Sequence, residues 1–499
     1  MSHDTLPQTP DAFDENLVDL LVEEHLASRV PRLQRLWDYY RNEPESGTPG
    51  GNARTPQHAG LPERLRPHDG RRRREVVIEN DIAWRVHALV DFMFGKPFTL
   101  DSTASHPARA LLLSAFLREV FRLNGGIRFF QDLGLLGSVY GYVDVLLRLG
   151  SAPANHSPNP GGVSGPRRTG RDAVAQDTDP HRAALPFRLE TIEPPAAVPV
   201  LHPSDYRETE AYLIHTRHTL NEAAPRTSLR RSPTGSPRAR TVIERTELWT
   251  PRWVVRSRGR GDRRELIDRR VNRLGRIPVV HIQNLPQPFF YEGLSEVEPL
   301  VPLQDELNTR LSDRANRVTF QSFKMYLGKG IDGFHEMPVG PGQMWSTDNP
   351  DASIEAIGGD SESPSETAHI NELREAMDKA SAVSPVAAGL LRGRVGNLTS
   401  ANALRLTLMG LVARTERKRI SYGEGIERLC ELLLHAADVT GVLPNEPAER
   451  GVRIDWPSPI PENESQRLQD ARLKLELGVP RDRVLAELGY PVTVSREEA

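Results

Sequence analysis

The chain has 499 residues, of which 38% are hydrophobic and 26% are charged. Its 64 basic and 67 acidic residues leave a formal net charge of −3, which argues against a protein that coats nucleic acid, because such proteins carry a large basic excess. The 41 prolines and 38 glycines gather in clusters, which predicts several loop or disordered segments between folded pieces.

A single cysteine, Cys430, lies in an apolar helical run, where it reads as a small buried hydrophobe. One cysteine cannot form an internal disulfide framework or a zinc knuckle, so a reducing compartment is expected. The acidic, polar N-terminus has no signal-peptide pattern. No stretch reaches 18 apolar residues, so no membrane span is expected.

The first half of the chain alternates helical and polar segments. Residues 15–41 show helical spacing of leucines and predict two helices divided at Pro31, and residues 42–70 predict a mobile loop. Four arginines at 71–74 suit either a solvated loop end or a contact with nucleic acid or an acidic neighbour. Helices are predicted over 79–94, 107–122 and from 127 to 137, and a strand is predicted over 140–148.

The next segments read as β-structure. Residues 150–184 are Pro/Gly/Ser/Asn-rich and predict a disordered insertion. Residues 185–284 contain short strand patterns between turns and predict a meander, interrupted by a polar insertion at 221–241. His215 and His218 lie on one of these strands and are expected to be surface residues.

The most regular stretch, residues 294–326, predicts a long helix. Ser295 and Glu298 form a capping-box pattern, and the regular helix should start near Pro302. An irregular β excursion (323–363), a polar helix (364–384), a glycine-rich loop (385–399) and a long helix with possible kinks at glycines (400–438) follow. A helical pair completes the chain, and the fold class is therefore α+β.

The two polar helices have narrow apolar stripes and charged flanks of both signs. Such a pair suits packing against copies of itself, and head-to-tail contacts can close into a ring. The inter-subunit contacts are predicted to involve the charged residues Asp305, Glu306, Arg310, Asp313, Arg314 and Arg317. No phosphate loop, GxSxG elbow, HExxH or CxxC pattern is present, so catalysis is not expected and no cofactor or metal is implied.

Four passages, in order, carry a resemblance to a known family. They are ENDIAWRVHALVDFMFGKPFTL, GLLGSVYGYVDVLL, LGRIPVVHIQN with LVPLQDELNTRLSDRANRV, and LTSANALRLTLMGLVARTERKR. Together they resemble the portal proteins of tailed double-stranded DNA bacteriophages of the siphophage type. Ala401 departs from the glycine usual at that position, and the three insertions have no clear counterpart.

The resemblance implies an architecture and partners. Residues 1–290 would form a wing, 291–322 and 364–384 two stem helices, 323–363 a clip, 385–399 a tunnel loop, 400–438 a long wing helix and 439–499 a helical crown. A dodecameric ring at one capsid vertex, assembled in the host bacterial cytoplasm, would carry double-stranded DNA during genome packaging and ejection. Its partners would be the terminase large subunit, the head–tail adaptor protein, and the major capsid and scaffold proteins.

Within that scheme, specific residues are assigned roles. The glycine-rich tunnel loop carries Arg392 and Arg394, which can touch phosphates without reading sequence, and Asn397. Tyr326 and Trp345 of the clip would be either core residues or anchors for a partner. A ring-forming scaffold or structural protein unrelated to DNA is the alternative function.

Overall fold

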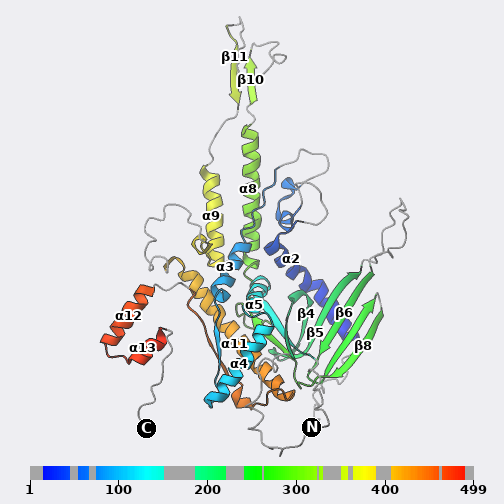
Figure 1. Cartoon of the computed structure of the whole chain (residues 1–499). Coiled ribbons are helices and arrows are strands. Elements are labelled where there is room, and N and C mark those ends of the chain that lie inside the picture. Colours follow the sequence, from blue (N-terminus) through cyan, green and yellow to red (C-terminus); the bar gives the residue numbers. More distant parts are fainter. Residues whose placement is uncertain are drawn as a thin grey trace, which may run out of the picture. The chain divides into compact units, whose positions relative to one another are not determined.

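The computed structural model describes residues 15–44, 54–66, 75–150, 186–220, 241–260, 263–322, 325–329, 350–357, 364–388, 406–459 and 464–488. The chain divides into two compact units (Figure 1). The sheet unit comprises Met1–Gln34, Val86–Ser295 and Ala382–Ala499, and the hairpin unit comprises Arg35–Arg85 and Glu296–Ser381. Helices and antiparallel sheets occupy separate stretches, which confirms the predicted α+β class.

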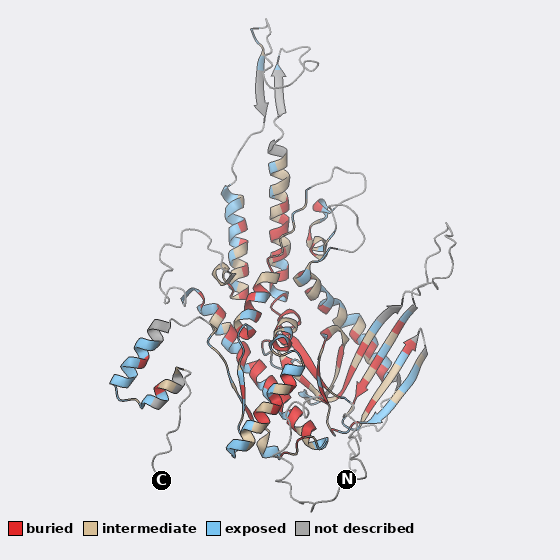
Figure 2. Cartoon of the chain, in the orientation of Figure 1, coloured by how far each residue is buried: buried red, intermediate tan, exposed pale blue. Residues whose placement is uncertain are grey.

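The core of the sheet unit surrounds a three-stranded antiparallel sheet in the order β3-β2-β9. The strands are β2 (Tyr142–Leu149), β3 (Phe187–Ile192) and β9 (Val279–Gln283). Residues 142–147 of the central strand are all buried, because helices and sheet cover both faces. The core helices include α3 (Ala83–Phe94), α4 (Pro107–Leu123), α5 (Ile127–Tyr140) and α11 (Met409–Val439), and Figure 2 shows buried residues gathered along them.

Close backbone approach fixes how these helices pack. A side chain at Gly425 of α11 would meet Ile282 of β9 at 2.5 Å, and one at Gly137 of α5 would meet the Tyr422 hydroxyl at 2.0 Å. The helix α11 runs without a break through Gly423 and Gly425, and a turn at Leu408 precedes it. Cys430 is fully buried, as predicted, and burial raises the pKa of its thiol.

The second sheet of this unit has five antiparallel strands in sequential order, which confirms the predicted meander over residues 197–271. The first and last segments of the predicted meander, β3 and β9, pair instead with β2 in the three-stranded sheet. The strands are β4 (Ala197–His202), β5 (Asp205–Leu220), β6 (Thr241–Trp249), β7 (Trp253–Arg260) and β8 (Arg263–Val271). Val18 and Val22 of α1 (Glu15–Glu24) pack with Leu213 on one face. Tyr212 and Trp249 pack with residues of β2 and its surroundings on the other face.

The prediction of a helix break at Pro31 is wrong. A π-helical turn, η1 (His25–Arg29), joins α1 directly to α2 (Val30–Arg41). Proline removes one backbone donor and crowds the preceding turn, and the wider π turn ahead of it accommodates this without ending the helix.

Shorter elements complete the sheet unit. β1 (Thr99–Ser102) pairs with β12 (Val452–Asp455), although neither strand was predicted. α12 (Glu464–Glu476) and α13 (Arg481–Glu487) form the predicted C-terminal helical pair, with Gly478 at φ +86° between them. The 3₁₀ turns are η4 (Pro194–Ala196), η7 (Pro385–Ala388) and η8 (Pro447–Glu449).

The hairpin unit contains α8 (Val301–Ser322), preceded by η5 (Glu298–Leu300), and α9 (Pro364–Ser381). The 22 residues of α8 span about 33 Å. Between the two helices, β10 (Met325–Lys329) pairs with β11 (Ser353–Ile357) in antiparallel register. The predicted order of helix, β excursion and helix is confirmed.

The segment 42–70 differs from its prediction as a mobile loop. Residues 54–66 form two 3₁₀ turns, η2 (Pro56–Gly60) and η3 (Glu63–Leu65), in the hairpin unit. Gln57, Leu61 and Leu65 are at most 3% exposed, so this segment is anchored by buried side chains. The polar composition concealed the anchor, because Gln57 is buried through hydrogen bonds and not through apolar contact.

Candidate functional site

The centre of the hairpin unit is a polar ladder on one face of α8. Four polar side chains stand at successive i, i+4 positions and face an extended segment, residues 75–81, which we call the strap. Each side chain accepts a hydrogen bond of 3.0 Å from an alternate strap amide. The pairs are Asn316 with Glu75, Ser312 with Val77, Asn308 with Glu79, and Gln304 with Asp81.

Two of the same side chains also donate to strap carbonyls: Asn316 to Glu75 at 2.7 Å and Gln304 to Glu79 at 2.6 Å. The single hydroxyl proton of Ser312 lies between the Asn308 carbonyl at 2.7 Å and the Val77 carbonyl at 3.2 Å. Four residues of helix rise about 6.0 Å and two residues of extended chain rise about 6.6 Å, so the two repeats stay in step. One face of α8 thereby replaces the neighbouring strand that the strap would otherwise need.

A buried amide connects this ladder to the rest of the unit. Asn308 donates to Gln57 at 3.0 Å, and both side chains are fully buried. Gln57 in turn donates to the carbonyl of Tyr39 at 2.9 Å, and its backbone amide donates to Asn42 at 3.1 Å. The network therefore joins α8, residues 54–66 and the end of α2 into one hydrogen-bonded structure.

Tyr39 carries the network to the first charged residue of α8. Its hydroxyl donates to Asp305 Oδ1 at 2.7 Å. Burial and this hydrogen bond raise the pKa of Tyr39 to about 12, and burial raises the pKa of the Asp305 carboxyl. Arg35 lies at 4.0 Å from the other carboxylate oxygen of Asp305.

Ion pairs, one of them fully buried, hold the base of the hairpin. Arg85 is fully buried and bonds Asp81 at 3.0 Å and Asp378 of α9 at 2.6 Å. Arg374 of α9 bonds Glu79 of the strap at 2.7 Å. Both contacts join α9 to the strap or to the residues after it, so the strap links the two helices. Removing one partner of a buried pair typically costs about 3–5 kcal/mol.

Five of the six charged residues predicted to lie between subunits have partners within this chain. Glu306 pairs with Arg310 at 2.6 Å, Asp313 pairs with Arg64 at 2.7 Å, and Arg317 pairs with Glu366 of α9. Arg314 is exposed and forms no ion pair with any residue in the described ranges. Contacts of these six residues with a neighbouring subunit stay a prediction.

The other predicted site residues lie wholly or partly outside the described residues. Arg392, Arg394 and Asn397 of the tunnel loop and Trp345 of the clip are outside the described residues. The backbone of Tyr326 pairs with Ala356 in the β10–β11 ladder, while its side chain is also outside the described part of the chain.

The predicted cap at Ser295 is not formed. The Ser295 hydroxyl donates to the carbonyl of Val139 at 2.6 Å, and the α-helix starts six residues later at Val301. His215, predicted to be a surface residue, is only 4% exposed and bonds Thr246 at 3.0 Å. His215 shares a face of β5 with Ala211 and Leu213, and these residues cluster with Val18 and Val22 of α1, so this face is covered at His215.

The sheet unit contains a buried carboxylate, Asp144 of β2. Its oxygens accept hydrogen bonds from Tyr212 at 2.6 Å and Tyr291 at 3.1 Å, and His281 Nδ1 lies at 2.7 Å. Burial raises the pKa of both tyrosines well above the usual value. His281 Nε2 also lies 2.7 Å from the carbonyl of Tyr291, so the cluster fixes the chain after β9.

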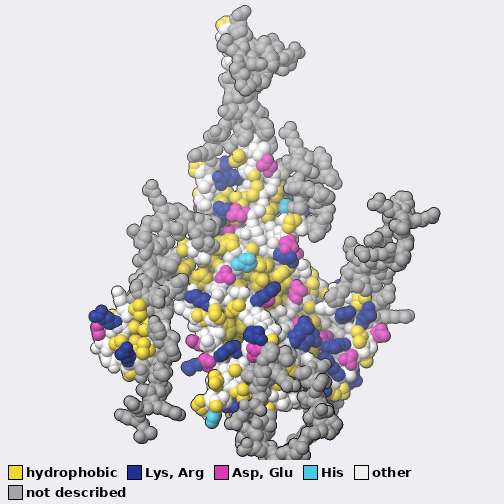
Figure 3. Space-filling model, viewed as in Figure 1, with side chains coloured by type: hydrophobic (Ala, Val, Ile, Leu, Met, Phe, Trp, Pro, Cys, Tyr) yellow, Lys and Arg dark blue, Asp and Glu magenta, His cyan; other side chains and the backbone are white. Residues whose placement is uncertain are grey.

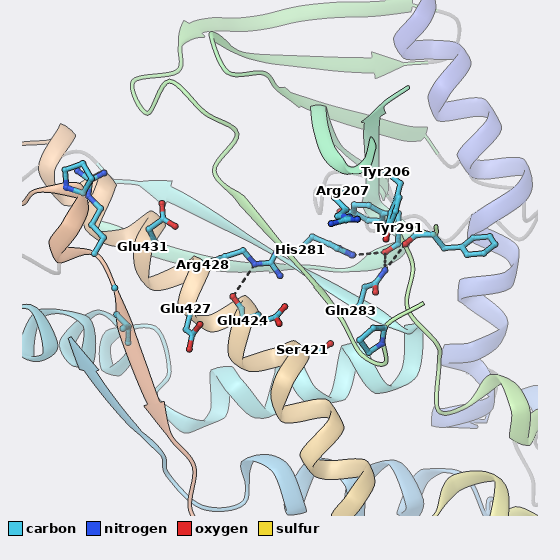
Figure 4. A pocket seen from close by; sticks show the side chains of 16 residues that line it. Tyr206, Arg207, His281, Gln283, Tyr291, Ser421, Glu424, Glu427, Arg428 and Glu431 are labelled. Atoms are coloured by element: carbon cyan, nitrogen blue, oxygen red, sulfur yellow. Dashed lines mark hydrogen bonds between the residues drawn. The ribbon is translucent and has the colours of Figure 1, made fainter. Parts of the chain in front are cut away.

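A hollow of about 750 Å³ borders this cluster (Figure 4). His281, Gln283 and Tyr291 line one side, and Glu424, Glu427 and Arg428 of α11 line the other. The carboxylate of Asp144 is saturated by its own donors and is fully buried, so it is not available as a general base from the hollow. Across the described ranges, no group of three His, Cys, Asp or Glu residues has a metal-binding arrangement.

No helix in the described parts of the chain has the length and apolar character of a membrane span. The fold and the site thus define an α+β protein that contains a polar helical hairpin with a β-ladder between its two helices. A family model for phage portal proteins of the SPP1 Gp6-like type matches residues 19–489, and the chain belongs to this family. It is therefore a phage portal protein.

Solved structures of gene transfer agent particles show similar chains. One is in the virion of the native particle, at 13% identity, covering 83% of this chain and 90% of that chain with a TM-score of 0.41. Another is in the neck of the empty particle, at 12% identity, covering 83% and 91% with a TM-score of 0.42. Among the curated proteins there is no match.

The ladder residues were not predicted as a functional group. Gln304, Asn308, Ser312 and Asn316 were visible in the sequence as polar residues every fourth position, within a passage that carries the family resemblance. The signal that could have identified them is this spacing combined with a nearby extended segment whose amides need partners.

Proposed function

We propose that this portal protein assembles into a ring, expected to be a dodecamer, at one vertex of the capsid. The ring serves as the channel for packaging and ejection of double-stranded DNA, which it contacts without sequence specificity. It docks the terminase large subunit during packaging and the head–tail adaptor protein afterwards, and it contacts the major capsid and scaffold proteins. The chain has no catalytic activity of its own.

The observation that carries the proposal is the buttressed hairpin in a chain of the portal family. The α8 ladder, the strap and the ion pairs of Arg85 fix the hairpin together with buried apolar residues such as Leu307 and Met377. A rigid hairpin with polar sides suits a repeated stave of a channel wall, because its geometry is set before neighbours bind. The near-neutral net charge of −3 suits a channel through which DNA slides, since many contacts with phosphates would slow the movement of the DNA.

The finer assignments follow the same scheme. Residues 291–322 and 364–384 form the channel stem, 323–363 the clip, 385–399 the tunnel loop and 439–499 the crown. Arg392 and Arg394 meet DNA phosphates in the channel, with Asn397 beside them. Trp345 and Tyr326 contact the terminase or the adaptor at the clip.

Electron microscopy of the purified protein in negative stain tests the ring. Rings with a central channel about as wide as duplex DNA support the proposal, and a population of monomers and dimers at all concentrations would refute it. Rings that assemble into particles lacking nuclease-protected DNA would favour the alternative, a ring-forming scaffold unrelated to DNA.

A matched pair of variants tests the tunnel loop. The double variant Arg392→Ala/Arg394→Ala should form rings but lose packaged DNA, measured as nuclease-protected DNA per particle. Arg258→Ala/Arg260→Ala removes the same Arg-Gly-Arg pattern from β7 and should leave packaging unchanged. Failure of only the first variant to form rings would show that the loop assignment is wrong.

A further inference from the structure

The hairpin unit has two flanks of opposite charge. The basic flank lies on the end of α2 and on residues 54–66 and includes Arg35, Arg41 and Arg64, whose side chains are 60%, 52% and 48% exposed. Arg41 pairs with Glu43 at 2.6 Å and Arg64 with Asp313 at 2.7 Å, so of these three Arg35 is the least neutralised. The acidic flank is the outer face of α9, with Glu372 and Glu375, both exposed. Figure 1 shows α2 and α9 on opposite sides of α8, and Figure 3 shows side chains of both signs along this unit.

Contacts with α8 place the two flanks at the same height. On one side, Arg35 lies 4.0 Å from Asp305. On the other side, His369 of α9 lies 3.7 Å from Glu306, the next residue of α8. Adjacent helix positions differ by about 1.5 Å in height and about 100° in direction. Further along α9, Arg374 bonds Glu79, whose amide bonds Asn308 of α8, and Asp378 bonds Arg85, which pairs with Asp81 opposite Gln304. Glu375 lies between Arg374 and Asp378, and Asp305 lies between Gln304 and Asn308, so Glu375 and Arg35 project from different sides at nearly one level.

The flanks are only partly neutralised within the chain. The nearer contact of Asp305 is the 2.7 Å hydrogen bond from Tyr39, and Arg35 reaches the same carboxylate only at 4.0 Å. The side chain of Glu372 is 74% exposed beside His369 at 3.6 Å. Glu375 forms no ion pair with any residue that the structure describes. Each flank therefore has a charged side chain that can form an ion pair with a carboxylate or guanidinium of another molecule.

We propose that Arg35 of one copy pairs with Glu375 of the next copy, with Glu372 adding to the negative potential. The partner is a second copy of this chain, because one subunit carries both halves of the contact on opposite sides at one height. Because the contact is heterologous, an open row of subunits has an unpaired Arg35 flank at one end and an unpaired Glu375 flank at the other. Closing the row into a ring pairs these two flanks. This inference rests on the proposed ring and specifies which surfaces meet in it.

Complementary charge at an interface sets register and rejects wrong pairings more than it adds affinity. An exposed ion pair changes an association constant by roughly fivefold at most. Reversing one charge places like charges together at every subunit contact of the ring. We therefore expect Arg35→Glu and Glu375→Arg each to lower the fraction of protein in rings at least about fivefold at low ionic strength.

Mixing the two variants makes the decisive experiment. In a ring that alternates Arg35→Glu and Glu375→Arg copies, each contact joins opposite charges again. Rings should return in a 1:1 mixture, and also in the Arg35→Glu/Glu375→Arg double variant, to within about twofold of the wild type. Mass photometry of full-length protein, checked by negative-stain images, measures the ring fraction.

The controls separate this inference from the function on which it rests. Arg122→Glu reverses an arginine with a 61% exposed side chain in the sheet unit and should assemble like the wild type. Equal melting temperatures of all variants exclude misfolding. If Arg35→Glu or Glu375→Arg fails to fold, the neutral variants Arg35→Gln and Glu375→Gln are measured in its place. The neutral variants should lose most of the salt dependence of assembly. Wild-type protein that forms no rings would refute the proposed function, whereas wild-type rings with no loss in the single variants, or no recovery on mixing, would refute only this contact.

Discussion

Replacing Asn308 by alanine tests whether the polar ladder holds the strap. Asn308 is fully buried, accepts a hydrogen bond from the Glu79 amide at 3.0 Å and donates to Gln57 at 3.0 Å. Alanine leaves the Glu79 N–H and the Gln57 carbonyl oxygen without these partners. Gln304 keeps its bond to the Glu79 carbonyl at 2.6 Å, so it is not left unpaired.

The magnitude follows from those two groups. A buried polar group deprived of its partner costs about 1–3 kcal/mol, so the sum is about 2–6 kcal/mol. Water that enters the loosened strap will recover part of this, so we take the low end of the range, about 2 kcal/mol. At 1.4 kcal/mol per factor of ten, local opening of the strap should become about 30-fold more frequent.

Hydrogen exchange read by mass spectrometry with residue-level fragmentation is the assay. In the wild type, the amides of Glu75, Val77, Glu79 and Asp81 should exchange slowly, because these are the ladder donors. In Asn308→Ala, the Glu79 amide should exchange about 30-fold faster, and its ladder neighbours should also speed up. Arg314→Ala, an exposed change on the same helix, should leave all four unchanged. Equal exchange in Asn308→Ala and the wild type would refute the role assigned to the ladder.

Three further predictions concern the sheet unit. Gly141→Ala should lower the melting temperature far more than Gly441→Ala: both have positive φ (+92° and +69°), but only at Gly141 does a new Cβ meet backbone, the Gly293 carbonyl at 2.3 Å. Equal melting losses would contradict this account. Burial lowers the pKa of His215 from 6.5 to about 4. Between these two pH values the unfolded chain binds a proton at this residue that the folded chain does not. The free energy of unfolding should therefore fall by about 2–3 kcal/mol as the pH drops through this window. His215→Gln should remove that part of the pH dependence in denaturant titrations, and an unchanged slope would exclude it. Cys430, buried with a raised pKa, should resist iodoacetamide in native protein and react in guanidinium; rapid native labelling would contradict its placement.

The sequence predicted those elements whose periodicity is set by burial on one side. The helix of 22 residues from Val301, the five-stranded meander and the C-terminal helical pair follow apolar spacing and turn residues, and each is present. The prediction was weaker where polar residues are buried by hydrogen bonds. Residues 54–66 appeared to be a mobile loop, yet Gln57 is as buried as any core leucine.

The long polar helix shows the division most clearly. By itself, the sequence determined that α8 is a helix with a narrow apolar stripe, charges of both signs and a place in the portal family. It did not determine where the polar face points, because Asn, Ser and Gln every fourth residue suit water, a neighbouring subunit or buried backbone equally well. In the tertiary structure, this polar face binds the backbone of the strap, residues 75–81. The strap amides need hydrogen-bond acceptors, and one turn of α8 has nearly the same rise as two strap residues.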